Sequence, residues 1–357
     1  MSNKTKFTCE PPTTPEEWDW IVDISPQGTL FSKSWYLSAC RRDHSLFVIR
    51  QGRQIKAGLS LIHTEDGKGC ELDDLVIHNG LMFVPDDTKK TVRAKFERFE
   101  LSKFVIDFLE HRYDRIELAL APSFEDMRPF LWHNYHNSGL GRRFILDLRY
   151  TSYVDIGSLN GREHSFEDSD CFRAMETLRQ RHVREARKKG AKVIKANHAS
   201  NLITYYRALM EKQGDPVPEK KLAHIEILIN SLLATGKAAI YEVQNDASQV
   251  LYAVFYGWDD KRAYYLFGAG HPEISEPYQG TFAHWSAFMD LANRTKIGEV
   301  DMEGVNSPQR GWFKLGFGGN LLPYYQISMT HSLGNLPPTV FREQLLAGKN
   351  STLELSA

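Results

Sequence analysis

The sequence predicts a mixed α/β fold in which one order of elements occurs twice. Short hydrophobic runs bounded by turn residues alternate with longer amphipathic segments of helical period. The order helix, helix, three strands, long helix, strand, short helix, strand is found in each half, without a repeat at the level of residues. A three-stranded meander that continues through a helix into another strand gives a sheet with antiparallel and parallel pairs. We therefore expect two α/β domains, 1–165 and 166–335, and a tail over 336–357.

The first half opens with a helix whose start, Thr14-Pro-Glu-Glu, combines a capping threonine, a proline and two acidic residues. Its longest helix has apolar residues that lie mostly on one stripe: Phe96, Phe99, Leu101, Phe104, Ile106 and Phe108. In order, the predicted elements are helices Thr14–Ile24 and Ser34–Arg41, strands Ser45–Arg50, Ile55–His63 and Glu71–Phe83, helix Thr88–Tyr113, strand Arg115–Ala121, helix Phe124–Asn134 and strand Phe144–Ile156.

The second half follows a polar, turn-rich stretch over Gly157–Asp170, which is typical of a domain junction. A basic helix, Met175–Gly190, precedes the repeated order. The predicted elements are then helices Ala199–Gln213 and Glu219–Thr235, strands Ala238–Gln244, Val250–Trp258 and Arg262–Ala269, helix Tyr278–Arg294, strand Glu299–Glu303, helix Pro308–Leu315 and strand Leu321–Met329.

Composition and charge exclude several classes of protein. A net charge of -1 gives no overall field toward DNA or a membrane surface, so a site for a polyanion has to be local. The four cysteines lie far apart and form no CxxC pair, which argues against a thiolate metal site or a disulfide scaffold. No apolar run is long enough to span a membrane, and the first residues lack a signal-peptide pattern. We expect a cytoplasmic protein without a metal.

The densest cluster of charge is Arg179–Lys195, which holds eight lysines and arginines. In a helix, Arg181, Arg184 and Lys188 share one face, because they follow the spacing i, i+3, i+7. Such a cluster in an otherwise neutral chain favours a binding site for phosphate groups or RNA. The alternative is a solvated helix face, where most runs of charge belong.

The segment Asp301–Tyr325 carries the candidate catalytic residues. By strand alternation, Asp301 and Glu303 point to the same side of the sheet, and Lys314 lies on the short helix that follows. Ligands of open α/β sheets bind beyond the carboxyl ends of the strands. A lysine there can hold a phosphate or stabilise an oxyanion. The alternatives are a surface lysine at 314 and a core phenylalanine at Phe313.

Further residues of this region are candidates for substrate binding and proton transfer. Asp301, Glu303 and His271 are candidate acceptors of a proton from an amine, unless the amine loses its proton without a protein base. The expected substrate-binding residues are Arg181, Arg184, Lys188, His271, Tyr278, Asn306, Trp312 and Tyr325. A tyrosine at a strand edge can equally be a half-buried packing residue.

Three motifs resemble those of the FemABX aminoacyltransferases and their GNAT-type acetyltransferase relatives, including the cellulose-biosynthesis-type enzymes. They are Asp301–Gly304, the block from Phe313-Lys314 to Phe317-Gly318-Gly319, and the basic pattern Arg181–Gly190. Supporting segments are Arg128–Trp132, Tyr264–Gly268 and Tyr278-Gln279-Gly280. The resemblance extends to about His331. It implies a tandem duplication of the GNAT fold, with Lys314 stabilising the carbonyl oxygen or a donor phosphate and Phe313 positioning the donor.

The resemblance implies transfer of an acyl or aminoacyl group to an amine, such as an amino sugar or peptide precursor of the cell envelope. The donor is aminoacyl-tRNA in one alternative, favoured by the basic cluster, and acyl-CoA or an acyl carrier in another. The loop Gly268–Gly280 departs from the pyrophosphate-binding pattern of coenzyme-A enzymes, since it is longer and contains Glu273 and Glu276. A third alternative is an inactive tandem domain that binds a nucleotide sugar or RNA.

Overall fold

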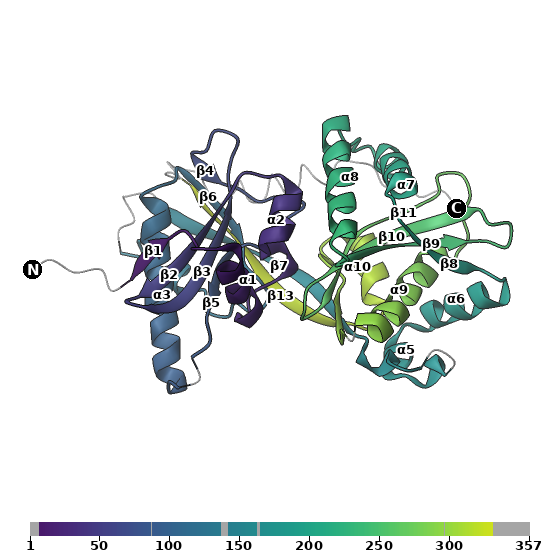
Figure 1. The fold of residues 1–357 in the computed structure, drawn as a ribbon, viewed down its shortest axis with the longest axis horizontal. Coiled ribbons are helices and arrows are strands. Elements are labelled where there is room, and N and C mark those ends of the chain that lie inside the picture. Colours follow the sequence, from purple (N-terminus) through teal and green to yellow (C-terminus); the bar gives the residue numbers. More distant parts are fainter. Residues whose placement is uncertain (1–6, 87, 137–141, 163–164, 296, 331–357) are drawn as a thin grey trace, which may run out of the picture.

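The computed structural model describes residues 7–86, 88–136, 142–162, 165–295 and 297–330, and its strands form two sheets (Figure 1). One is a four-stranded antiparallel sheet with the order β1-β2-β3-β5. The other has nine strands in the order β4-β6-β13-β7-β12-β11-β10-β9-β8. The fold is the mixed α/β class that the sequence predicts. The predicted tail, 336–357, lies outside the described residues.

In the first part of the chain, a hydrophobic core lies between helix α3 and the strands that pack against it. The elements are β1 (Thr8–Glu10), α1 (Pro15–Ile24), α2 (Ser34–Cys40), β2 (His44–Gln51), β3 (Gln54–Ile62), β4 (Gly69–Cys70), β5 (Gly80–Phe83), α3 (Thr91–Glu110), β6 (Arg115–Ala119), α4 (Arg128–Trp132) and β7 (Arg143–Asp155). The hydroxyl of Thr14 accepts the backbone N–H of Glu17, as the helix-start signal predicts. In α3, Leu101, Val105 and Leu109 enter the core, whereas Phe96 is 64% exposed and does not join the predicted stripe.

The second part places helices on both faces of its strands. The elements are α5 (Asp170–Ala174), α6 (Thr177–Lys188), β8 (Lys192–Ala196), α7 (Ser200–Lys212), α8 (Glu219–Ala234), β9 (Ala238–Gln244), β10 (Val250–Trp258), β11 (Ala263–Gly270), α9 (Gln279–Thr295), β12 (Glu299–Asp301), α10 (Pro308–Leu315) and β13 (Asn320–Thr330). Helices α6 and α9 pack in one core, through Val183 and Phe288 among others. Helices α7 and α8 pack in a second core that also contains Leu37 of α2, so this core joins the two parts.

The last strands of the two halves exchange places. Strand β13 inserts between β6 and β7, with Gln326 opposite both Ala119 and Asp147. Strand β7 in turn pairs with β12, at Asp155 opposite Glu299. The two long strands cross the middle of the molecule and make one continuous sheet of both halves (Figure 1). The repeated order of elements is present except at the third strand of the first half, while a domain division near residue 165 stays a prediction.

Of the predicted strand Glu71–Phe83, only the last residues, Gly80–Phe83, form a strand. The chain instead forms β4 and β5, which belong to different sheets, with a loop between them. In this loop the Asp73 carboxylate accepts the backbone N–H of Leu75, a local turn that competes with strand pairing. Gly80 then has a φ of 92°, which favours glycine and turns the chain into β5. The loop carries His78 into the centre of the molecule.

Other elements differ from the prediction at the ends of the second half. The predicted strand Glu299–Glu303 ends at Asp301, because Glu303 has a φ of 56° and leaves the strand conformation. The predicted basic helix Met175–Gly190 is confirmed as α6, and the last residues of the basic run Arg179–Lys195 belong to the edge strand β8. The polar junction predicted over Gly157–Asp170 leads directly into the short helix α5.

Candidate functional site

A cavity of about 740 Å³ opens where two parallel strands separate. Strands β11 and β12 pair at Ala263–Val300 and Tyr264–Asp301 only; β11 then continues to Gly270, whereas β12 has ended. The cavity is lined by β11, by the first turn of α9 and by Phe313 and Lys314 of α10. It thus occupies the crevice beyond the carboxyl ends of strands, where open α/β sheets bind ligands.

Lys314 lies at the junction of this cavity with a second one of about 410 Å³. Its Nζ donates to the carbonyl oxygens of Glu303 and Gly304, at 3.3 and 3.2 Å, and lies 5.0 Å from the ring centre of Tyr265. Burial lowers the pKa of Lys314 to about 8, against the opposing effect of the Glu303 and Asp301 carboxylates. The ammonium is therefore half-buried, held in place and accessible from two sides, and is not the surface lysine of the alternative interpretation.

The two cavities differ in their linings. The larger one has many apolar and aromatic side chains, including Leu209, Met210 and Phe267. The smaller one is lined mostly by polar and charged residues: Asp73, Asp74, Arg149, Asn306, Ser307, Arg310, Lys314, Tyr324 and Gln326. Asp74, Arg310 and Lys314 line both cavities.

Phe313 connects α10 to α9 and to Arg179 of the basic cluster. Its ring packs against His284 and Phe317, with ring centres 5.6 and 5.5 Å away. The guanidinium of Arg179 lies over the same ring at 4.5 Å and donates to the hydroxyl of Thr281 at 3.3 Å. Phe313 therefore packs in the core and also lines the larger cavity.

The carboxylates of Asp301 and Glu303 are both buried behind Lys314. Asp301 Oδ1 accepts the Thr151 hydroxyl at 2.5 Å and the Glu303 backbone N–H at 2.8 Å. Burial raises the pKa of Asp301 to about 6 and raises that of Glu303, which the negative charge of Asp301 raises further. The two carboxylates come together because the chain turns at Glu303, not by strand alternation as predicted.

The three predicted binding residues of the basic helix lie away from both cavities. Arg181, Arg184 and Lys188 are exposed on α6. Arg184 forms an ion pair with Glu167 at 2.9 Å. Their role in binding phosphate or RNA stays a prediction, and it concerns the exposed surface of α6 and not either cavity.

The other predicted substrate residues take different places. Asn306 lines the smaller cavity and bonds both backbone groups of Tyr150. Trp312 is 75% exposed, Tyr278 is buried in the core beside α9, and Tyr325 packs at the edge of the first core. His271 Nδ1 accepts the backbone N–H groups of Glu273 and Ile274, so this nitrogen is occupied in a turn.

Several residues at the site were not selected from the sequence. Arg149 reaches the smaller cavity because β7 and β13 are neighbours, and His78 reaches the carboxylates from the loop of the first half. These contacts depend on pairing between distant segments, for which a single sequence gives no signal. Arg310 could have been selected from the sequence, because it lies one helical turn before Lys314 and on the same helix face.

Searches with the sequence find no match, either to a protein-family model or to a curated protein. Solved structures do match. FemX superposes with a TM-score of 0.61 at 12% identity, covering 89% of this chain and 96% of FemX. The chain has the fold of FemX. A tandem GNAT protein from the clavulanic acid biosynthesis pathway matches with a TM-score of 0.51 at 10% identity, covering 91% of this chain and 98% of that protein.

A conserved protein of unknown function from Bacteroides thetaiotaomicron also matches, with a TM-score of 0.54 at 10% identity over 89% of this chain and 98% of that one. At these identities the likeness concerns the fold, and the predicted tandem GNAT architecture is confirmed. Among the helices that the structure describes, none is both long and apolar enough to cross a membrane.

Proposed function

We propose that this FemX-like protein transfers an acyl or aminoacyl group to the amine of a second substrate. In this proposal the amide forms beside the Lys314 ammonium, and the lysine itself is not acylated. The observation that supports this most directly is the position of the Lys314 ammonium, half-buried at the meeting point of two cavities. A reaction between two substrates needs two such sites that open onto a single reacting centre. The larger, more apolar cavity suits the acyl donor, and the smaller, polar one suits the amine acceptor.

In the proposed reaction the amine nitrogen attacks the carbonyl carbon of the donor, and negative charge develops on the carbonyl oxygen. A fixed positive charge at this point stabilises the transition state more than the ground state. The carbonyl groups of Glu303 and Gly304 hold the Lys314 ammonium by its other hydrogens, so that it need not reorganise during the reaction. The tetrahedral intermediate then collapses, the bond to the leaving group breaks and the amide is released.

The amine loses a proton when the amide forms. We propose, as the sequence suggested, that Asp301 or Glu303 accepts this proton. Asp301 Oδ2 and both carboxylate oxygens of Glu303 are buried without a hydrogen-bond partner among the described residues, and are therefore unoccupied acceptors. His271 is less suited to this role, because its Nδ1 already accepts two backbone N–H groups.

The direct test is an amide-forming assay with the full chain. Aminoacyl-tRNA and acyl-CoA are each offered as donor with amino sugars and short peptides as acceptors, and mass spectrometry detects the product. We expect a new amide bond with one donor class only. Absence of turnover with every pair, together with tight binding of a nucleotide sugar or RNA, would favour the inactive binding protein instead.

Variants of the exposed face of α6 can show which of the two donors the protein uses. We expect that reversing Arg181, Arg184 and Lys188 to glutamate lowers kcat/KM with aminoacyl-tRNA by about tenfold or more and reduces its salt dependence, because contacts to phosphate groups are lost. The rate with an acyl-CoA donor should hardly change. The matched control reverses three exposed basic residues of α3, Arg93, Lys95 and Lys103, and should not affect either donor. Equal rates for the wild type and the α6 variant with aminoacyl-tRNA would exclude this face from binding the donor.

A further inference from the structure

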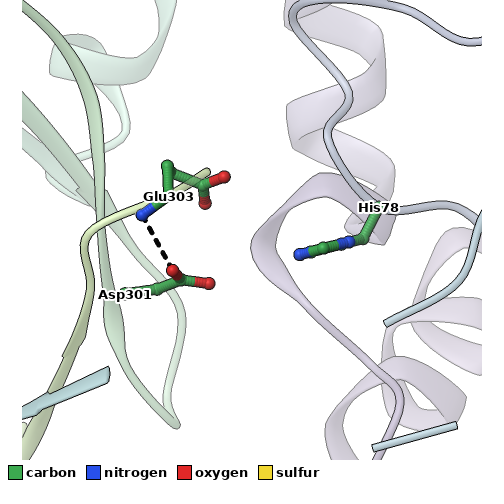
Figure 2. Close-up of side chains that lie close together, drawn as sticks. All are labelled: His78, Asp301 and Glu303. Carbon is green, nitrogen blue, oxygen red and sulfur yellow. Dashed lines mark hydrogen bonds between the residues drawn. The ribbon is translucent and has the colours of Figure 1, made fainter. Parts of the chain in front are cut away.

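Three side chains from distant parts of the chain converge in the interior next to Lys314. His78 comes from the loop between β4 and β5, and Asp301 and Glu303 lie at the end of β12 and just after it. Figure 2 shows the imidazole of His78 pointing across a space toward the two carboxyl groups. One possible ligand atom from each residue lies within 4.8 Å of the others, and each residue is at most 6% exposed.

The atoms that face one another in this cluster lack hydrogen bonds. Within the described part of the chain, both ring nitrogens of His78, Oδ2 of Asp301 and both carboxylate oxygens of Glu303 are buried without a partner. Buried polar groups without partners cost about 1–3 kcal/mol each, and most proteins avoid them. Since no hydrogen bond joins His78 to either carboxylate, direct pairing does not explain why the three groups converge.

The positively charged side chains around the cluster do not fully balance its two carboxylates, so a bound cation would be favoured. Two positively charged side chains are near, Arg262 and Lys314. Arg262 forms an ion pair with Glu299 at 3.2 Å and donates to the Tyr153 hydroxyl at 2.7 Å, so its charge is largely compensated outside the cluster. Lys314 is directed to two backbone carbonyl oxygens. When Asp301 and Glu303 are both ionised, their two negative charges are opposed by the single positive charge of Lys314. One negative charge is therefore left unbalanced.

We propose that His78, Asp301 and Glu303 bind a divalent transition-metal ion. A set of one imidazole nitrogen and two carboxylate oxygens suits Zn²⁺ and other divalent first-row transition metals, whereas Mg²⁺ prefers oxygen ligands alone. A tetrahedral site with bonds of about 2.1 Å separates its ligands by roughly 3.4 Å. A small inward rotation of the three side chains therefore completes the set.

The proposed site keeps a position open. Ile77 and Gly304, the chain neighbours of His78 and Glu303, line the smaller cavity together with Tyr324, whose ring lies 4.8 Å from that of His78. None of the three ligand residues lines this cavity, so a fourth ligand would have to reach the ion through the wall that Ile77, Gly304 and Tyr324 form. Three protein ligands and one open position are typical of sites where a metal binds a substrate and is not only structural.

Binding of Zn²⁺ to the full chain, without a histidine tag and after treatment with a chelator, tests the proposal. We expect isothermal titration to show one tight site per chain, which excess Mg²⁺ does not displace. The substitutions His78→Gln and Glu303→Gln should each weaken Zn²⁺ binding by about 100-fold or more. The matched control is His133→Gln, which removes a partly buried histidine from a second group of possible ligands, Asp107, Glu110 and His133. This variant should bind Zn²⁺ like the wild type.

A titration of the unmodified chain with Co²⁺ keeps the test decisive if a buried variant fails to fold. An intense visible d–d absorption would support a site with four or five ligands, and a spectrum like that of aqueous Co²⁺ would overturn the proposal. So would equal Zn²⁺ affinity in the wild type and a folded His78→Gln variant. Zn²⁺ binding and amide formation are measured separately, because the titration needs no acyl donor. The two proposals compete for the same oxygens of Asp301 and Glu303, since a carboxylate oxygen that binds the ion does not also accept the proton of the amine.

Discussion

Replacing Lys314 by methionine is expected to lower the turnover of amide formation by about 100-fold or more. Methionine keeps the length and the apolar part of the side chain but removes the ammonium that lies between the two cavities. Loss of one preorganised donor to an oxyanion costs about 10²–10³ in kcat in enzymes that depend on it. The measurement is kcat and KM of the variant with the donor and acceptor identified in the assay above.

The control for this prediction is Lys220→Met, which removes an exposed lysine of α8 that lines neither cavity. Its rate should equal that of the wild type. The melting temperature of both variants shows whether a loss of rate comes from unfolding. If Lys314→Met folds and keeps the wild-type rate, Lys314 has no part in the reaction and the proposed function loses its main support.

Replacing Lys261 by methionine is expected to lower the free energy of unfolding by about 3 kcal/mol. The Lys261 Nζ donates to three carbonyl oxygens at and beyond the end of α1, those of Val22, Ser25 and Gly28, at 2.8, 2.6 and 3.1 Å. Hydrogen bonds from a charged donor are worth about 1.5–3 kcal/mol, and their loss leaves partly buried acceptors without a partner. Denaturant titration measures the difference.

The matched control is Lys237→Met, whose ammonium forms an exposed ion pair with Asp260 at 2.8 Å. Such a pair is worth about 0–1 kcal/mol, so this variant should be nearly as stable as the wild type. Similar losses in both variants would mean that the contacts of Lys261 with α1 do not stabilise the fold.

The stability difference between the wild type and Lys261→Met should also depend on pH. Burial lowers the pKa of Lys261 to about 8 in the folded chain, from an ordinary value of 10.5. Between these values the unfolded chain binds more protons at this residue than the folded chain does, so the wild type gains stability as the pH rises. The difference should therefore be constant below about pH 7 and widen from pH 8 toward 10. A difference that narrows over this range would contradict the assigned direction of the shift.

The sequence predicted those parts of the fold that depend on local patterns. The helices α1, α9 and α10 and the meander β9–β11 have strong periodicity or clear turn residues, and the structure has each of them within a few residues of the prediction. The Lys314 helix was found for the same reason, because a turn with Pro308 leads into it and Gly318-Gly319 follow it.

The rest depends on contacts between distant segments. Asp301 and Glu303 were selected, but the predicted reason, strand alternation, does not apply because Glu303 leaves the strand. His78 was assigned to a strand, since the apolar run around it resembles one, and its burial beside the two carboxylates follows from the loop between β4 and β5. In the basic cluster, the sequence could not show that Arg179 is the member that packs on Phe313.

The insertion of β13 between β6 and β7 has a consequence for synthesis of the protein in the cell. A ribosome makes β6 and β7 long before β13, and until then each has an edge without its partner. Exposed strand edges favour aggregation, and pairing between segments distant in sequence is slow. We therefore expect the nascent chain to depend on chaperones until about residue 330 has left the ribosome. A gene truncated before β13 should yield insoluble protein, even though the whole first half is encoded.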